Sequence, residues 1–225
     1  MEIDPQWKAK QEQRNREELE KAIAESMSRD DVPSRYRSAR MTDFKPDSFR
    51  VPDKFGPGVF ITGPAGSGKT HLAAAFRVAY LERHGAYCPI GSKVIACART
   101  APWANVPDLL YRIRRSFNID HKRAVPDDDG LLPLKESDIV DPLRSANMVV
   151  LDDFGAEKAT PWSGQLLYLL VSWRLDRVLP LIITSNLSIE DIDTFDPRLA
   201  SRCAAMQRYV VNGPDVRQTW QGGKT

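Results

Sequence analysis

The sequence predicts an α/β domain in which short parallel strands alternate with helices. Three apolar runs support this prediction, at residues 59–62, 148–151 and 181–185, and each ends in polar residues. Buried parallel strands are typically continuous apolar runs, and polar side chains at their carboxyl ends are typical of binding sites. With 225 residues, of which 42% are hydrophobic and 28% charged, the chain is long enough for one sizeable core plus a tail.

The stretch from Gly63 to Thr70 lies between the first apolar run and a helical pattern at residues 69–84. It matches the pattern G-x-x-x-x-G-K-T, whose glycines let backbone N–H groups approach phosphate oxygens at a helix N-terminus. Lys69 is expected to reach the β- and γ-phosphates, and Thr70 to ligate Mg²⁺. The alternative, a glycine-rich turn without a ligand, is disfavoured by the flanking strand and helix. The predicted nucleotide-binding residues are Gly63, Pro64, Ala65, Gly66, Ser67, Gly68, Lys69 and Thr70.

Residues 1–30 are expected to form a charged N-terminal helix. Leu19, Ile23 and Met27 make one thin apolar stripe, and a pair such as Glu17 with Lys21 supports an exposed helix. Such a helix is either solvated or a docking element for a partner.

Residues 31–54 are expected to be a linker, because prolines at positions 33, 46 and 52 interrupt them. Tyr36 and Phe44 in this linker either anchor it or pack on a nucleotide base, and anchoring is the simpler interpretation. Residues 55–225 are expected to form the nucleotide-binding domain.

The region after the first helix is expected to add a strand and then a second helix. Residues 86–106 must supply one strand and contain enough β-forming sequence for two or three. Pro107 and Asp108 suit the start of a helix that runs to Phe117. Residues 124–142 are expected to be an acidic, proline-bearing surface loop.

A basic run begins in this second helix, beside Tyr111 and Phe117. Cationic and aromatic side chains together are typical of a surface that binds single-stranded DNA, although a solvated helix face fits the pattern equally well. The candidate DNA contacts are Arg112, Arg114, Arg115, Lys122 and Arg123.

Asp152 and Asp153 follow the second apolar run, where a buried parallel strand delivers carboxylates to the edge of a sheet. Together with the phosphate-binding loop upstream, they indicate a Walker B element. We expect Asp152 to hold the Mg²⁺ shell and Asp153 to orient and deprotonate an attacking water. Asn186 follows the third run and is expected beside Asp153, where it can position that water.

The overall charge excludes a uniformly basic nucleic-acid-binding protein, because 32 Lys and Arg against 30 Asp and Glu leave a net charge of +2. Any DNA contact must therefore come from a local patch. Cys88, Cys97 and Cys203 form no paired framework, which is typical of a reducing compartment. Without an apolar leader or a run of about 20 apolar residues, the sequence predicts a cytoplasmic protein without membrane contact.

Four segments in order resemble the DnaC/IstB-type AAA+ ATPases. They are Gly63–Thr70 with His71-Leu72-Ala73, Leu151–Glu157, Thr184–Leu187 and Asp196–Arg202. Two upstream elements, Val32–Tyr36 and Val106–Leu110, are also similar to that group. The resemblance covers residues 32–217.

The resemblance implies a three-layer α/β/α P-loop NTPase fold of the AAA+ class, with a five-stranded parallel sheet. It also implies that ATP and Mg²⁺ bind at the strand carboxyl ends and that copies of the chain form a ring or spiral. In such homo-oligomers an arginine of one subunit completes the neighbouring site; Arg202 resembles that finger, with Arg198 as its companion. Arg217 is similar to the sensor 2 arginine of the family. Residues 86–101 exceed what the family usually has, and no large C-terminal lid is expected after Arg217.

The function implied by the resemblance is a slow ATPase of DNA replication that a partner or DNA regulates. We expect a DnaC-like loader that binds single-stranded DNA and a replicative DnaB-type helicase. An IstB-like transposition ATPase, which acts with a transposase on duplex DNA, is an alternative that the ATPase core does not separate. A small-molecule P-loop kinase is a remote alternative, because residues 124–142 offer neither an acceptor pocket nor an arginine-bearing lid.

Overall fold

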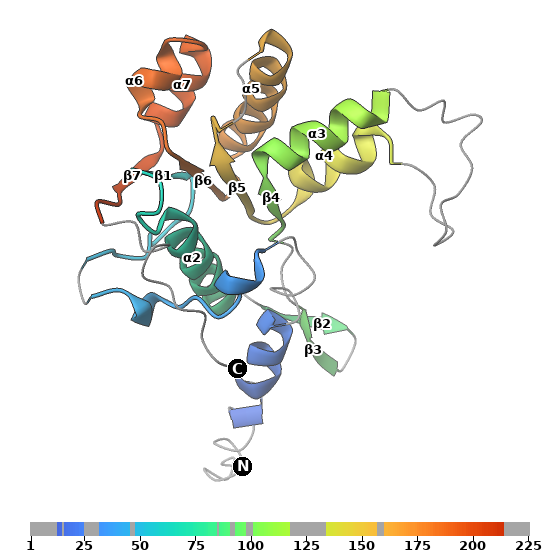
Figure 1. The fold of residues 1–225 in the computed structure, drawn as a ribbon. Coiled ribbons are helices and arrows are strands. Elements are labelled where there is room, and N and C mark those ends of the chain that lie inside the picture. Colours follow the sequence, from blue (N-terminus) through green and yellow to red (C-terminus); the bar gives the residue numbers. More distant parts are fainter. Residues whose placement is uncertain are drawn as a thin grey trace, which may run out of the picture.

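In the computed structural model, the chain folds around one five-stranded parallel sheet (Figure 1). The structure describes residues 13–14, 16–24, 32–45, 48–84, 101–117, 134–156 and 160–213, and the backbone of residues 86–90 and 93–97. The strands are β1 (Val59–Thr62), β4 (Trp103–Asn105), β5 (Val149–Phe154), β6 (Leu181–Ser185) and β7 (Gln207–Val210), in the order β4-β5-β6-β1-β7. Every neighbouring pair in this sheet is parallel, which confirms the predicted sheet.

Helices cover both faces of the sheet, because successive residues of each strand point to opposite sides. On one face, α2 (Lys69–His84) packs against Val59 and Ile61. On the other face, Phe60 and Leu151 belong to an apolar cluster that the remaining helices share. These helices are α3 (Val106–Phe117), α4 (Glu136–Ser145), α5 (Pro161–Asp176), α6 (Ile189–Asp193) and α7 (Pro197–Ala204). The arrangement is the expected three-layer α/β/α sandwich.

The region between α2 and α3 contains three strands, of which one enters the main sheet. β2 (Ala86–Ile90) and β3 (Lys93–Cys97) pair antiparallel as a separate two-stranded sheet, and β4 follows them. Figure 1 shows this hairpin away from the main sheet. Residues 86–101, whose role the sequence leaves open, therefore contain a two-stranded hairpin before β4.

The surface loop predicted at residues 124–142 is wrong in part, because residues 136–142 lie in helix α4. The apolar side chains Ile139, Val140 and Leu143 recur at helical spacing and are buried in the core. Their burial outweighs the single backbone hydrogen bond that Pro142, inside the helix, cannot donate. Residues 124–133 of the predicted loop lie outside the described residues.

The N-terminal helix packs on the domain through its apolar side. Residues 16–24 are helical, and Ile23, which is 2% exposed, belongs to the same apolar cluster as α2. Leu19 is partly buried against that cluster, whereas Met27 lies outside the described residues. In the described part of the chain, no helix combines the length and apolarity needed to cross a lipid bilayer.

The segment predicted as a linker follows the surface of α2. It contains two short 3₁₀ turns, η1 (Ser34–Tyr36) and η2 (Met41–Asp43). Val32 and Ala39 are buried in the apolar cluster on α2, and Phe55 ends the segment in the same cluster. Apolar contacts therefore fasten this segment to the domain along its length.

A buried arginine fixes the starts of the two strands that lead to the candidate site. Arg174 of α5 donates hydrogen bonds to the carbonyl oxygens of Leu143 at 2.7 Å, Ala146 at 3.0 Å and Pro180 at 2.7 Å. Burial lowers the pKa of Arg174 to about 10, so the guanidinium keeps its charge at neutral pH. These bonds tie the chain just before β5 to the chain just before β6.

Candidate nucleotide site

The loop from Gly63 to Thr70 joins the carboxyl end of β1 to the first turn of α2. A Cβ at Gly63 would collide with the carbonyl oxygen of Val211, the residue that follows β7. The N–H of Val211 donates to the carbonyl oxygen of Thr62 at 2.8 Å. Glycine is therefore required where the ends of β1 and β7 meet at the entrance to the loop.

Lys69 points its ammonium group across the loop toward the end of β6. Its Nζ donates to the carbonyl oxygen of Pro64 at 2.8 Å and to Oδ1 of Asn186 at 2.6 Å. Both oxygens are neutral, and Lys69 is buried. A buried ammonium group beside a glycine-rich loop at a helix N-terminus favours the approach of an anion. Asn186 thus reaches the site, where its amide contacts Lys69.

Asp152 lies at the carboxyl end of β5 and is 3% exposed. Its Oδ1 accepts hydrogen bonds from the hydroxyl of Thr70 at 3.1 Å and from that of Thr184 at 2.6 Å. Burial raises the pKa of Asp152 to about 6, against the opposing effect of the Thr184 hydrogen bond. Two oxygens that suit a Mg²⁺ shell, on Thr70 and Asp152, are thus adjacent.

Asp153 reaches the same site because β5 is irregular near its end. In a regular strand, consecutive side chains point to opposite faces, so Asp152 and Asp153 would diverge. The register with β6 shifts between Leu151 and Phe154, and Asp153 has a left-handed backbone with a φ of 57°. Aspartate tolerates this conformation better than most residues. The irregularity therefore lets Asp153 line the same pocket as Thr70.

The Asp153 carboxylate is held from a neighbouring strand. Asn105, the last residue of β4, donates from Nδ2 to Oδ2 of Asp153 at 3.4 Å. Oδ1 of Asn105 accepts from the backbone N–H of Asp108, in the first turn of α3, at 3.2 Å. Asn105 therefore links the second carboxylate to the helix that carries the basic run. Sequence reasoning missed this residue, because 48 positions separate it from Asp153.

Thr184 is a second residue that sequence reasoning did not single out. It is buried in β6, where its Oγ1 donates to Oδ1 of Asp152 and accepts from the N–H of Asp153 at 3.0 Å. One hydroxyl thus fixes the side chain of the first carboxylate and the backbone of the second. A threonine before Ser185 and Asn186 gave the only signal, as part of a polar strand end.

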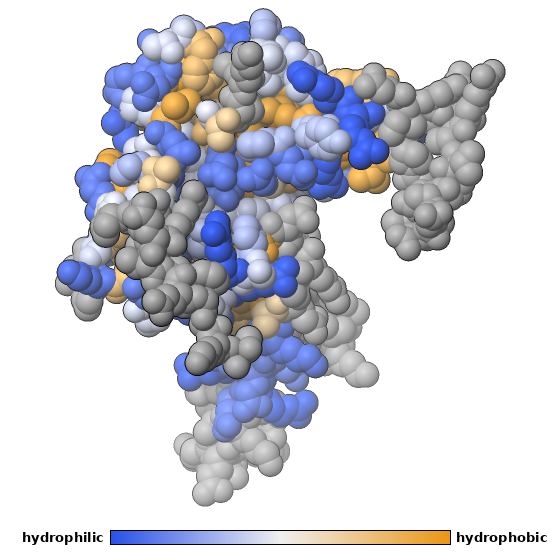
Figure 2. Space-filling view, viewed as in Figure 1, coloured by the Kyte–Doolittle hydropathy of each residue, from blue (hydrophilic) through white to orange (hydrophobic). Residues whose placement is uncertain are grey.

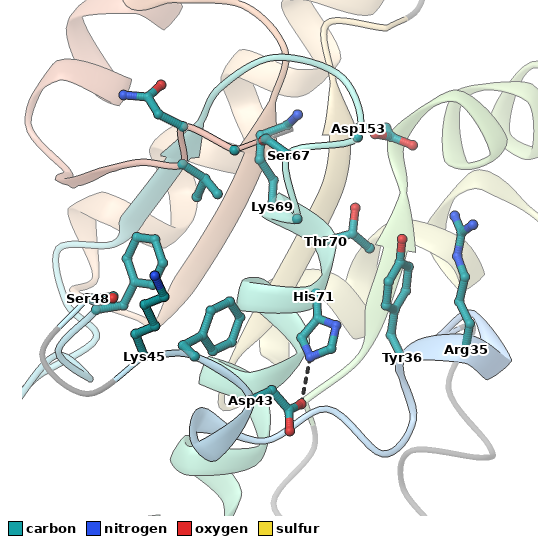
Figure 3. Close-up of a pocket in the computed structure, with 17 residues that line it drawn as sticks. Arg35, Tyr36, Asp43, Lys45, Ser48, Ser67, Lys69, Thr70, His71 and Asp153 are labelled. Carbon is teal, nitrogen blue, oxygen red and sulfur yellow. Dashed lines mark hydrogen bonds and ion pairs between the residues drawn. The ribbon is translucent and has the colours of Figure 1, made fainter. Parts of the chain in front are cut away.

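A pocket of about 640 Å³ opens beside the phosphate-binding loop (Figure 3). The loop and Asp153 line one side, and seven residues of the predicted linker line another: Arg35, Tyr36, Asp43, Phe44, Lys45, Ser48 and Phe49. Tyr36, Phe44 and Phe49 give this second wall an aromatic surface, with the rings of Phe44 and Phe49 5.4 Å apart between centroids. Tyr36 and Phe44 also pack against the apolar cluster on α2, as expected of anchoring side chains, and their packing on a base stays a prediction.

The residues of this site fit a nucleoside triphosphate bound with Mg²⁺. Ser67 Oγ is buried in the loop and has no hydrogen-bond partner within the described part of the chain. Buried hydroxyl groups are normally paired, so this orphaned atom indicates a ligand. The ammonium group of Lys69 and the oxygens of Thr70 and Asp152 supply the charge and the metal ligands that such a ligand needs.

The two arginines on α7 are not part of this pocket. Arg202 donates from Nη1 to Oδ1 of Asp176 at 2.6 Å, and Nη2 of Arg198 lies 3.2 Å from Oδ2 of Asp196. Neither arginine lines the pocket of its own chain. Their role at a neighbouring copy stays a prediction, and Arg217 lies outside the described residues.

The basic run on α3 lies beside exposed aromatic side chains. Tyr111 and Phe117 are 60% and 54% exposed. The guanidinium of Arg114 is 5.2 Å from the ring centroid of Trp162, and that of Arg115 is 5.9 Å from the ring of Tyr111. Figure 2 shows apolar surface among hydrophilic residues on this side of the molecule. Of the candidate DNA contacts, the structure describes Arg112, Arg114 and Arg115, whereas Lys122 and Arg123 lie outside the described residues.

Comparison with known proteins by sequence gives one distant relative. No protein-family model matches the chain. The uncharacterized protein YqaM of Bacillus subtilis is 24% identical to it over 203 residues. The match covers 87% of this chain and 56% of that relative, so the chain spans little more than half the relative's length.

Solved structures of replication proteins share the fold. The DnaC helicase loader matches with a TM-score of 0.56 at 22% identity, over 80% of this chain and 100% of that chain. DnaI matches with a TM-score of 0.56 at 18% identity, over 82% and 94%. Replication initiator DnaA bound to AMPPCP and single-stranded DNA matches with a TM-score of 0.57 at 14% identity, over 82% and 52%. The chain therefore shares the α/β fold of these replication proteins.

Proposed function

We propose that the protein binds and hydrolyses ATP and acts in DNA replication as a DnaC-like loader of a replicative helicase. One observation carries the proposal: Lys69, Thr70 and the two carboxylates of β5 converge at the carboxyl edge of the sheet, beside a pocket with an aromatic wall. The fold shared with the DnaC helicase loader and with DnaA supports it.

The phosphate-binding loop binds and orients the triphosphate. Backbone N–H groups at the start of α2 are donors to phosphate oxygens, and Lys69 supplies positive charge. Thr70 and Asp152 would hold Mg²⁺, which when bound neutralises phosphate charge and favours attack on the terminal phosphorus. The Thr184 hydrogen bond keeps Oδ1 of Asp152 turned toward Thr70.

Asp153 accepts the proton of the attacking water. Its carboxylate lines the pocket, and the hydrogen bond from Asn105 restricts its rotation. Asn186, whose amide contacts Lys69, can donate to the same water or to the terminal phosphate. A carboxylate fixed near the water lowers the barrier by general-base catalysis.

The base of the nucleotide packs on the aromatic wall. Tyr36, Phe44 and Phe49 line the pocket opposite the phosphate-binding loop. Aromatic rings bind a flat heterocycle through their faces and edges with little loss of side-chain entropy. The pocket is large enough to hold the base and ribose beyond the phosphates, at about 640 Å³.

Copies of the chain form a ring or spiral in which Arg202, with Arg198 beside it, completes the site of the next copy. The support is that both guanidinium groups are at least partly exposed on α7 and away from their own pocket, with side chains 62% exposed for Arg198 and 35% for Arg202. Arg217 acts as the sensor 2 arginine.

Single-stranded DNA binds along α3, and the charged N-terminal helix docks the helicase. Guanidinium groups attract the DNA backbone, and exposed aromatic rings stack on unpaired bases. Asn105 makes one hydrogen bond to α3 and another to Asp153, so DNA bound on α3 can affect the position of the hydrolytic carboxylate.

Three measurements on the purified protein test this function together. It should release phosphate from ATP, raise the fluorescence anisotropy of a labelled single-stranded oligonucleotide, and retain a replicative helicase in a pull-down assay. Arg115→Ala should weaken binding of the oligonucleotide, whereas the control Arg208→Ala, at an exposed position on β7, should not. Retention of a transposase with preference for duplex DNA would support the IstB-like alternative, and a phosphorylated metabolite would support a kinase.

A further inference from the structure

The pocket is bounded by two parts of the chain that approach each other at a polar contact. Nε2 of His71 lies 2.6 Å from Oδ2 of Asp43, which also accepts from the N–H of Arg40 at 2.9 Å (Figure 3). His71 directly follows Thr70 in the first turn of α2, and Asp43 ends η2 in the aromatic wall. The contact therefore joins the phosphate half of the pocket to the half that faces the base.

The imidazole ring of His71 is also the point on which the aromatic wall rests. The ring of Phe44 meets it edge-on at 5.3 Å and 89°, and the ring of Tyr36 does so at 6.0 Å and 73°. The side chains of His71, Asp43, Phe44 and Tyr36 all line the pocket. Edge-on contacts of this kind fix the relative orientation of rings. His71 therefore contributes to the position of Tyr36 and Phe44 relative to the phosphate-binding loop, together with the packing of both rings against the apolar cluster on α2.

We propose that His71 and Asp43 are positioning residues for the nucleotide: their contact holds the aromatic wall at the distance from the phosphate-binding loop at which a base fits. This inference rests on the nucleotide-binding part of the proposed function and is independent of helicase and DNA. It requires that base recognition depend on the contact and that phosphate recognition not depend on it.

The contact is not needed to keep the segment folded. Beneath the wall, Val32 and Ala39 are buried in the apolar cluster on α2, which fastens the segment on its own. The side chains of His71 and Asp43 are 35% and 38% exposed, and polar contacts this open to water contribute little to stability. Although partial burial raises the pKa of Asp43, its hydrogen bonds with Arg40 and His71 lower it overall, so the carboxylate is charged at neutral pH.

Two ligands that share the same phosphates separate the two halves of the pocket. AMPPCP carries a base and a non-hydrolysable triphosphate, whereas inorganic tripolyphosphate reaches the phosphate-binding loop alone. Calorimetric titration of both, with Mg²⁺, should show that Asp43→Ala and His71→Ala each weaken AMPPCP binding about fivefold, the worth of one hydrogen bond. The affinity for tripolyphosphate should stay the same.

The same titrations include a conservative variant, a double variant and a matched control. Asp43→Asn keeps an acceptor oxygen and should restore the affinity for AMPPCP. The double variant of Asp43→Ala and His71→Ala should bind no more weakly than the worse single variant, because both remove one contact. His84→Ala, at the far end of the same helix, should behave as the parent chain, and melting temperatures should agree throughout.

Three results would overturn the proposal. Equal losses of affinity for both ligands would show that the contact supports the phosphate-binding loop. Unchanged affinity for AMPPCP would show that the aromatic wall keeps its position without the contact. Additive losses in the double variant would mean that the two side chains act separately. If the parent chain itself bound neither ligand, the proposed nucleotide-binding function would be wrong. That outcome is distinct from the other three.

Discussion

Replacing Asp152 by asparagine should stabilise the metal-free protein while it abolishes hydrolysis. Burial raises the pKa of this carboxyl from 3.8 to about 6, so the folded protein binds its proton more tightly than the unfolded chain does. Stability therefore falls as the pH rises from about 4 to about 6, and above that window the charged carboxylate carries a constant penalty. At about 1.4 kcal/mol per unit of pKa, the penalty is about 3 kcal/mol.

Asparagine removes the penalty and keeps the two hydroxyl contacts. The hydroxyl groups of Thr70 and Thr184 both donate to Oδ1 of Asp152, and an amide oxygen at the same place accepts both. Asp152→Asn should therefore raise the free energy of unfolding by up to about 3 kcal/mol at pH 8 and by nothing below pH 4. For a chain of this size the gain corresponds to about 6–12 °C in melting temperature.

The assay is thermal unfolding followed by circular dichroism in EDTA, from pH 4 to pH 8. Asp193→Asn, an exposed aspartate at the end of α6, is the matched control and should show no pH-dependent gain. The reasoning would be refuted if the Asp152→Asn variant melts no higher than the parent chain at pH 8. It would also be refuted if the variant melts higher than the parent chain by the same margin at every pH. Mg²⁺ with AMPPCP should stabilise the parent chain and not the variant, since a ligand stabilises the form that binds it.

Four further substitutions test the separate parts of the site. Lys69→Ala should weaken AMPPCP binding at least about 100-fold, because no other cation on the loop replaces its charge; unchanged affinity in calorimetry would contradict the phosphate-binding loop. Asp153→Asn should bind ATP normally but release phosphate about 100-fold more slowly, and full turnover would move the general base elsewhere. Asn105→Ala should lower kcat about tenfold with little change in KM, as expected for the loss of one hydrogen bond to a catalytic carboxylate; a change in KM alone would argue for a role in binding. Mixing Arg202→Ala subunits with Asp153→Asn subunits should restore part of the hydrolysis in composite sites, and no recovery in a mixed oligomer would count against a role in trans.

Local patterns in the sequence were sufficient for the central elements. The glycine-rich loop before Lys69 and the two carboxylates after an apolar run each have a physical reason within a few residues of the chain. The same holds for α3, where Pro107 and Asp108 lie in the first turn and Asn105 accepts from the N–H of Asp108 at 3.2 Å. Such features depend on hydrogen bonds between near neighbours, so spacing alone predicts them.

The remaining features depend on contacts that spacing does not contain. Asn105 contacts Asp153 only because β4 lies next to β5, and that order follows from the whole sheet. The aromatic wall forms because the segment around Tyr36 runs along α2, a contact that the prolines of this segment do not indicate. In α4, Pro142 indicated a loop, although burial of neighbouring side chains stabilises a helix there.

The position of Ile23 restricts how the N-terminal helix can meet a partner. Because its apolar side is already buried on α2, the side open to solvent is charged, with Arg14 and Glu18 paired at 3.7 Å and Glu17 and Lys21 exposed. A partner that docks on the helix in place meets charges, so its association rate should fall steeply with ionic strength. A partner that binds the apolar side requires the helix to detach from the domain first, and its association would then be slow and insensitive to salt.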